Sequence, residues 1–187
     1  MSSTALLDAN VLHPMVLCDL LIRLALAGYY RPLWSLEILD ETARSIHRRR
    51  PDLAIDLLQR RVDAMNRVFP DAVVTGYDEL LAELPALGKD AHVLAAAVRG
   101  RADVIVTHNV RDFPAALIDR YHVIVQTPDE FLGHHWRRAP EAVARILIEQ
   151  SAGTRAPHLR PREILDRLKP MAPEFVHSAL ESNKLPE

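Results

Sequence analysis

Short, continuous apolar runs alternate along the chain with longer stretches whose apolar residues recur at helical spacing. The short runs, some of them rich in β-branched residues, are typical of buried parallel strands. The longer stretches have apolar positions three or four residues apart, which predicts helices with one buried face. Strands are predicted at residues 4–7, 72–75, 103–107 and 121–125, and helices at residues 11–28, 77–84 and 90–100.

Two further helices are predicted after residue 35 from their capping residues. Ser35 can cap the first, because its hydroxyl can accept a hydrogen bond from a backbone amide, and Pro51 ends it. Asp52 is then expected to cap the second. The first helix is expected to bury Leu36, Leu39, Ala43 and Ile46, and the second Leu53, Leu57, Val62 and Met65.

Strands that alternate with helices predict an α/β fold in which helices cover a central parallel sheet. In such sheets ligands bind beyond the carboxyl ends of the strands. Asp8 directly follows the first predicted strand, and residues 108–112 directly follow the strand at 103–107. Both segments are therefore expected at one edge of the sheet.

The pattern changes at His134, where short amphipathic segments are separated by prolines. A helix is predicted over residues 142–150, and Pro161 and Pro173 each open another, because proline is well tolerated in the first helical turn. The chain is therefore predicted to divide into an α/β domain, residues 1–133, and a helical extension, residues 134–187.

The composition narrows the class of protein. With 187 residues, 49% of them hydrophobic, the chain is expected to form a packed core. The net charge of −2 excludes a uniformly basic nucleic-acid binder. Cys18, the single cysteine, excludes an intramolecular disulfide, and Asp19 and Arg23 in the helix at 11–28 argue against a membrane span. The N-terminus has no secretory signal pattern, so we expect a cytoplasmic protein.

Three aspartates at the ends of predicted elements are candidate metal ligands: Asp8 after a strand, Asp90 at a helix start, and Asp112 in a loop. Carboxylates gathered in one place repel each other unless a cation lies between them. Asn109 adds a neutral oxygen suited to a hard cation, and Thr107 could hold a neighbouring side chain by its hydroxyl. Each aspartate also has a simpler interpretation, as a turn, cap or loop residue.

The helix that follows Ser35 carries an acidic cluster and then a basic run. Helical spacing does not show which of Glu37, Asp40 and Glu41 would act as a site residue. The three could equally form a solvated face. The arginines that follow, including Arg44 and Arg48, are either ordinary surface charge or an edge that tracks phosphate groups. No histidine spacing matches a zinc site, and there is no P-loop, dinucleotide or nucleophile-elbow motif. Aromatic residues make up 5%, which does not support a base-stacking platform.

Taken together, these segments resemble the PIN-domain ribonucleases, in particular the VapC-type toxins, over about residues 4–133. Residues 7–12 (LDANVL) are similar to the first motif, and residues 35–41 (SLEILDE) to the second, with Glu41 at its acidic position. Residues 89–92 (KDAH) with the alanines at 95–97, residues 106–113 (VTHNVRDF) and residues 127–132 (TPDEFL) resemble the remaining three. Residues 134–187 resemble the C-terminal extension of a longer VapC-like subgroup.

The resemblance implies a three-layer α/β/α fold and an endoribonuclease that depends on Mg²⁺ or Mn²⁺. Asp8, Glu41 and Asp90 would hold the cation, and Asp112 or Asn109 would complete its ligands. Many relatives have an aspartate where Asn109 stands, so a second cation would bind more weakly or arrive with substrate. Candidate substrate contacts are Asn10, Thr107, Arg44 and Arg48. The implied partners are structured RNA such as tRNA or rRNA and a cognate antitoxin protein; a homodimer is allowed, and no membrane is expected.

Two other functions remain open at this point. The first is a non-catalytic PIN module that binds RNA or a protein partner, which the amide at Asn109 motivates. The second is a metal-dependent phosphatase of small molecules, although Asn10 replaces the second aspartate of the Asp-x-Asp start of one such superfamily. The extension could receive the antitoxin, cover the core or touch RNA, and the sequence does not separate these roles.

Overall fold

The computed structural model describes residues 3–155, 157–182 and 184–186. Within these residues five parallel strands form one sheet in the order β3-β2-β1-β4-β5. The first strand of the chain is therefore the central one. The strands are β1 (Ser3–Leu7), β2 (Tyr30–Ser35), β3 (Val73–Val74), β4 (Val104–Val106) and β5 (Ile124–Gln126).

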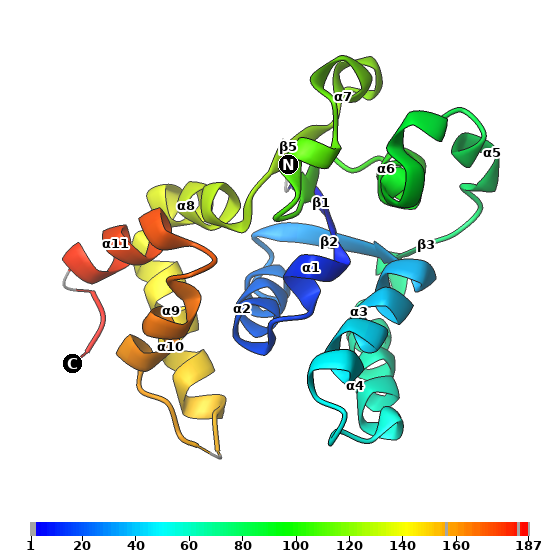
Figure 1. Cartoon of the computed structure of the whole chain (residues 1–187). Coiled ribbons are helices and arrows are strands. Elements are labelled where there is room, and N and C mark those ends of the chain that lie inside the picture. The colour runs from blue at the N-terminus through cyan, green and yellow to red at the C-terminus, as the bar shows by residue number, and fades with distance from the viewer. Residues whose placement is uncertain (1–2, 156, 183, 187) are drawn as a thin grey trace.

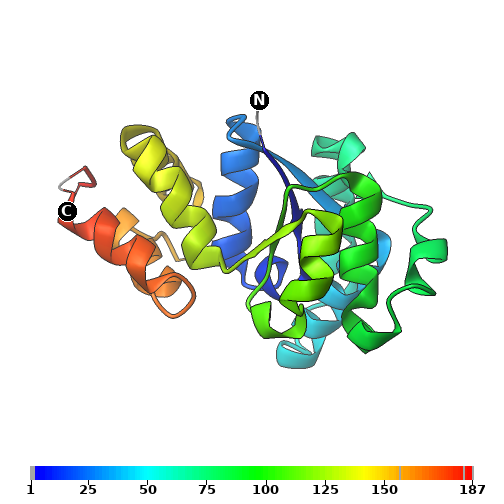
Figure 2. The ribbon, with the colours of Figure 1, turned by 90° about the horizontal axis from the view of Figure 1, so that it is seen from above.

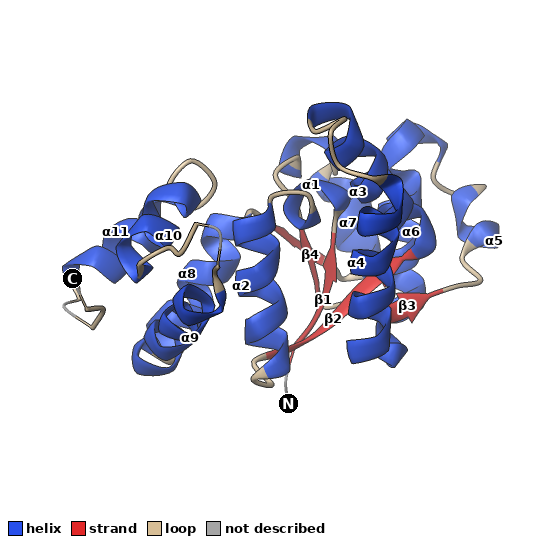
Figure 3. Ribbon diagram, turned by 90° about the horizontal axis from the view of Figure 1, so that it is seen from below, coloured by secondary structure: helices blue, strands red, loops and turns tan. Residues whose placement is uncertain are grey.

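Helices cover both faces of this sheet, which confirms the predicted three-layer α/β/α fold. Figures 1 and 3 show α6 and α7 over one face and α1 to α4 over the other. Parallel strands need such crossover helices, and the helices shield both faces from water. The helices of this part are α1 (Ala9–Leu12), α2 (Met15–Leu26), α3 (Leu36–Arg49), α4 (Ile55–Val68), α5 (Asp78–Leu81), α6 (Ala91–Gly100) and α7 (Ala115–Tyr121).

The register of β1 fixes what lies at the carboxyl edge of the sheet. Leu6 pairs with Leu33 of β2, and Leu7 pairs with Val106 of β4. The residues that follow these strands therefore emerge side by side, and the amide of Asp8 donates a hydrogen bond to the carbonyl of Val106. The expected common edge for Asp8 and the segment after β4 is confirmed.

Three sequence-based expectations about elements were wrong. The helix predicted over residues 11–28 is two helices, because Pro14 separates α1 from α2. Strand β2 was not predicted at all, since Arg31 and Pro32 interrupt its apolar pattern. The residues predicted as a strand from Tyr121 begin as the end of α7, and β5 is a partly exposed edge strand.

The two helices after Ser35 form, but their faces and caps differ from the prediction. Ser35 caps α3 by accepting a hydrogen bond from the amide of Ile38, as expected. Leu36, however, is 58% exposed, and Asp52 pairs with Arg50 at 2.7 Å instead of capping α4. The residues that α3 buries are Ile38, Leu39, Thr42 and Ile46, and those that α4 buries are Leu58 and Met65.

The last four helices pack against the side of the α/β unit. Figure 2 shows them beside α2, which lies between the sheet and α9. The amide of Gln150 donates a hydrogen bond to the carbonyl of Val16 across this contact. The predicted division between residues 133 and 134 stays a prediction, and α8 runs through it. The helices are α8 (Pro128–Arg138), α9 (Pro140–Gly153), α10 (Pro161–Leu168) and α11 (Pro173–Glu181).

Helix α2 contains the single cysteine and an ion pair between successive turns. Cys18 is buried, and Arg23 pairs with Asp19 one turn away at 3.0 Å. None of the helices in the described part of the chain is long and apolar enough to cross a membrane.

Candidate functional site

Asp8 lies at the carboxyl end of the central strand and begins α1. Its Oδ1 accepts a hydrogen bond of 2.6 Å from the amide of Ala9, so part of its carboxylate caps this short helix. The side chain is buried, with the residue 6% exposed. A buried carboxylate at a sheet edge is costly unless it is compensated by hydrogen bonds or by a cation.

Two neighbours hold the other oxygen of Asp8. Its Oδ2 accepts hydrogen bonds from the hydroxyl of Thr107 at 2.7 Å and from the amide of Asn10 at 2.7 Å. The Thr107 hydroxyl also accepts from Asn10 at 2.8 Å and from the backbone amide of Asn109 at 3.0 Å. The amide of His108 donates to Asn10 at 2.9 Å. This network ties the end of β1 to the end of β4 and fixes the orientation of the carboxylate.

Asp90 directly precedes α6 but does not cap it, because its side chain makes no capping hydrogen bond. Gly88 makes the turn before it in a backbone conformation of φ 52° and ψ −122°, which is open to glycine and strained for other residues. The Asp90 carboxylate therefore lies near the positive end of a helix without being used by that helix. It is half-buried and available to a ligand.

The pKa values of Asp8 and Asp90 are both raised by their surroundings. Burial raises the pKa of Asp8, hydrogen bonds from Thr107 and Ala9 oppose the rise, and the charges of Glu41 and Asp90 add to it. Burial also raises the pKa of Asp90, and Asp112 and Glu41 add to this rise while Lys89 and His92 oppose it. These charges put Glu41 and Asp112 in the electrostatic surroundings of Asp90, and Glu41 and Asp90 in those of Asp8. That the four carboxylates form one site stays a prediction.

His92 connects this region to a second glutamate. Its Nε2 lies 3.7 Å from a carboxylate oxygen of Glu41, and its Nδ1 lies 3.8 Å from one of Glu37. Glu37 and Glu41 are one turn apart on α3, so a single ring on α6 can face both. No site role was predicted for His92 from the sequence. Its place two residues after Asp90 and one turn before Ala96 was a usable signal that it lies near the candidate site.

The remaining candidate residues lie in different surroundings. Thr107 is fully buried and contacts Asp8 and Asn10, whereas Asn109 and Asp112 are exposed at the edge. Arg44 pairs with Asp40 at 2.8 Å. Arg44 and Arg48 both line a cavity of about 310 Å³ between α3 and α4. Their predicted role as substrate contacts stays a prediction.

The donors suit a hard divalent cation, although the described residues contain no group of three His, Cys, Asp or Glu side chains placed to hold a metal ion. Mg²⁺ keeps several waters and is commonly bound by only one or two carboxylates together with substrate phosphates. Asp8 is already oriented, Asp90 is uncapped, and Glu41 and Asp112 are exposed enough to turn. Oxygen donors of this kind favour Mg²⁺ or Mn²⁺ over zinc.

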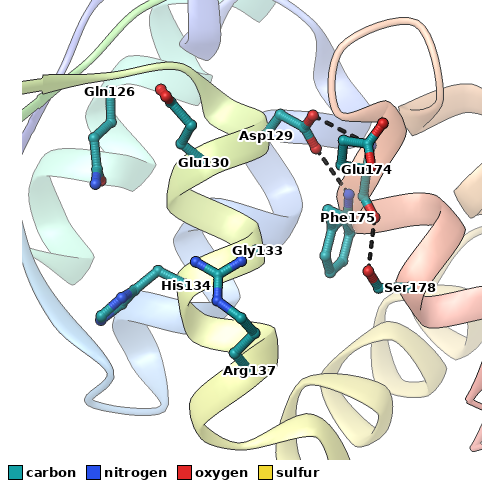
Figure 4. A pocket seen from close by; sticks show the side chains of 9 residues that line it. All are labelled: Gln126, Asp129, Glu130, Gly133, His134, Arg137, Glu174, Phe175 and Ser178. Carbon is teal, nitrogen blue, oxygen red and sulfur yellow. Dashed lines mark hydrogen bonds between the residues drawn. The ribbon is translucent and has the colours of Figure 1, made fainter.

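A cavity of about 420 Å³ lies elsewhere, between α8 and α11 (Figure 4). Its acidic residues have structural roles. Asp129 accepts hydrogen bonds from the amides of Glu174 and Phe175 at the start of α11, at 3.2 and 2.8 Å. Glu130 completes the capping box of α8 with Thr127. Asp129 therefore joins α8 to α11, and Glu130 stabilises the start of α8.

Two family models match different parts of the chain. A family model described as PIN domain matches residues 4–111, and one described as VapC50 C-terminal domain matches residues 128–181. The chain is 36% identical over 108 residues to a protein of Mycobacterium tuberculosis (strain ATCC 25618 / H37Rv) named "Putative ribonuclease VapC50". The aligned part is 58% of this chain and 64% of that relative, so the match spans less than two thirds of the relative. No solved structure matches the chain.

Proposed function

Because the chain belongs to the PIN-domain family, we propose that it is a metal-dependent endoribonuclease and the toxin of a toxin–antitoxin pair. The observation that carries this proposal is the buried carboxylate of Asp8, which Thr107 and Asn10 hold at the carboxyl edge of the sheet. A buried carboxylate at this edge is costly for the fold alone, whereas phosphodiester hydrolysis by a divalent cation requires such a ligand. The relative's printed name adds the ribonuclease activity to this argument.

The residues of this chain have distinct roles in the proposed reaction. Asp8, Glu41 and Asp90 would hold Mg²⁺ or Mn²⁺, with Asp112 or Asn109 as the remaining oxygen donor. When bound, such a cation lowers the pKa of water and stabilises charge on the phosphate. Thr107 and Asn10 keep the Asp8 carboxylate directed at the edge by hydrogen bonds of 2.7 Å each. The expected products carry 5′-phosphate and 3′-hydroxyl ends.

The proposed substrate is a structured RNA such as tRNA or rRNA. A chain of net charge −2 with an acidic site needs the cation to offset repulsion of the phosphate backbone. The proposed protein partner is a cognate antitoxin, which could place an arginine or lysine among the carboxylates.

The test is cleavage of a panel of tRNA and rRNA by the purified chain, free of antitoxin, with Mg²⁺, Mn²⁺ or EDTA. We expect discrete fragments with 5′-phosphate ends that require the metal and decrease at least about a hundredfold in Asp90→Asn. Thermal unfolding of the variant controls for its fold, and calorimetric titration with Mn²⁺ reports cation binding independently of cleavage. RNA binding without cleavage by well-folded protein would favour a non-catalytic PIN module, with Asn109 as its first explanation.

A further inference from the structure

A third cavity opens beside Asp90. Its volume is about 290 Å³, and it lies where the start of α6 meets α3 and the segment around α5. Lys89 and Ala91 line it, so it is adjacent along the chain to Asp90 on both sides. Small-molecule pockets usually begin at roughly 300 Å³, so this cavity suits one flat ring system rather than a whole nucleotide. The other lining residues are Glu37, Leu81, Leu84, Gly88 and His92.

Glu37 is the carboxylate of this cavity, and the proposed cation site does not use it. Its side chain is 52% exposed, and its Oε2 lies 3.5 Å from the hydroxyl of Tyr77 and 3.8 Å from Nδ1 of His92. Both contacts are long, so the carboxylate retains capacity to accept hydrogen bonds from a ligand.

His92 lies between this cavity and the proposed cation site. The residue is only 7% exposed, yet its Nδ1 is buried without a hydrogen-bond partner in the described part of the chain. Buried polar atoms normally have partners, and the carboxylate that faces this nitrogen is that of Glu37, 3.8 Å away. The other nitrogen of the ring faces Glu41 at 3.7 Å, which places the cavity next to the proposed cation site.

On the basis of the proposed nuclease function, we propose that this cavity binds a guanine base of the RNA beside the cleaved phosphate, and that Glu37 reads it. Guanine presents two adjacent donors, N1–H and the N2 amino group, which match the two oxygens of one carboxylate. Lys89 can donate to O6, a common lysine contact with guanine. Leu81 and Leu84 supply apolar walls for the ring, so no aromatic platform is needed.

The other bases fit this set of groups less well. Adenine and cytosine each present one donor beside a ring nitrogen that accepts, so the second carboxylate oxygen would face a lone pair. Uracil presents one donor between two carbonyl oxygens, which the carboxylate repels. RNA is most often read in this way at unpaired bases, whose Watson–Crick edges are free.

The first test uses stem-loop RNAs that differ only in one unpaired nucleotide, which is G, A, C or U at each loop position in turn. We expect the wild-type chain with Mg²⁺ or Mn²⁺ to cleave beside guanine on the order of tenfold faster than beside adenine. In Glu37→Gln this ratio should fall by about the same factor, because an amide matches the donor and acceptor of adenine. Glu79→Gln, an exposed glutamate outside the cavity, should leave the ratio unchanged.

The ratio is informative because a general loss of activity in Glu37→Gln, through His92 and Glu41, would slow all RNAs equally. The second test does not involve cleavage. With EDTA present, guanosine 5′-monophosphate should shift the methyl signals of Leu81 and Leu84 at lower concentration than adenosine 5′-monophosphate does, and Glu37→Gln should remove the difference.

The outcomes separate the two proposals. Cleavage with no guanine preference, or with a preference that Glu37→Gln retains, overturns the guanine site and leaves the nuclease intact. Absence of all cleavage overturns the nuclease, and the nucleotide titration then decides the guanine site by itself. Equal shifts of the methyl signals by guanosine and adenosine 5′-monophosphate would overturn the guanine site.

Discussion

Asp8 is the buried member of the proposed metal site, and its protonation sets when a cation can bind. Burial, with the charges of Glu41 and Asp90, raises its pKa, and the pKa of Asp90 is raised for similar reasons. A raised pKa means that the protonated form persists to a higher pH than in an ordinary aspartate. A cation must then displace these protons.

Cation affinity is therefore expected to rise with pH through the range in which Asp8 and Asp90 lose their protons, a range that begins above the ordinary aspartate value. Within it, affinity should change by up to about tenfold per pH unit for each proton released. Calorimetric Mn²⁺ titrations at about pH 4.5 to 7, in buffers of different ionisation enthalpy, count the protons. The Asp90→Asn variant should release fewer protons when Mn²⁺ binds. A cation affinity that is independent of pH across this range would contradict the expectation.

Thr107 is expected to act on the cation through Asp8. Thr107→Val keeps the shape but removes the hydroxyl that donates to Asp8 and accepts from Asn10 and from the amide of Asn109. We expect a loss of about 1–3 kcal/mol in the free energy of unfolding, and about 10–100-fold weaker Mn²⁺ binding. Denaturant unfolding and calorimetry measure the two effects. Thr107→Ser, which keeps the hydroxyl, should restore most of the affinity; if it does not, the hydrogen bond is not the cause.

At the level of residues, the sequence predicts the positions of the aspartates better than the positions of the groups that surround them. Asp8 and Asp112 could be placed at one edge because parallel strands end together. The pairing of Glu37 and Glu41 with His92 depends on which turn of α3 faces α6, and the exposed Leu36 shows that the apolar spacing misjudged that face. Helical periodicity fixes a stripe only to within about one residue position.

At the level of elements, the predictable parts are those whose apolar pattern is continuous. Strands β1 and β4 and helix α6 are of this kind and were predicted within a residue or two. Strand β2 was missed because its pairing with β1, rather than its own composition, makes it a strand despite Arg31 and Pro32. The sequence also gave no indication that Asp129 of α8 would cap α11, since the two helices lie 45 residues apart in that contact.

Asp129→Ala is expected to loosen the start of α11. This helix has no side-chain cap of its own, so removal of the carboxylate leaves the amides of Glu174 and Phe175 without an acceptor. The expected cost is about 1 kcal/mol. Hydrogen exchange of these two amides measures it: their exchange should accelerate in Asp129→Ala and less in Asp129→Asn. Asp166→Ala on α10 is the control, and unchanged exchange in Asp129→Ala would rule out the cap.

At the scale of the whole molecule, the α/β unit and the last helices share α2. This helix lies between β2 and α9, and α10 also contacts it. Removal of residues 134–187 should therefore expose apolar residues of α2 to water. We expect the free energy of unfolding to fall by several kcal/mol, since each fully buried leucine contributes about 1.5–3 kcal/mol.

A chain that ends at Gly133 tests this expectation by thermal unfolding and by binding of a hydrophobic dye. Its unfolding temperature should decrease and dye binding should increase relative to the full chain. An unchanged unfolding temperature would instead mean that residues 1–133 form an independent domain and that the extension does not stabilise it.

The central position of β1 also has a consequence for the time at which the chain can act during its synthesis. Strand β1 receives one neighbour at residues 30–35, but its other neighbour, β4, is made only from residue 104 onwards. Asp8 is thus exposed early on a half-paired strand, while Asp90 and Asp112 are still to be translated. Long-range pairing of this kind delays folding. A nascent chain therefore has none of the proposed metal site assembled until β4 and the segment after it have been translated.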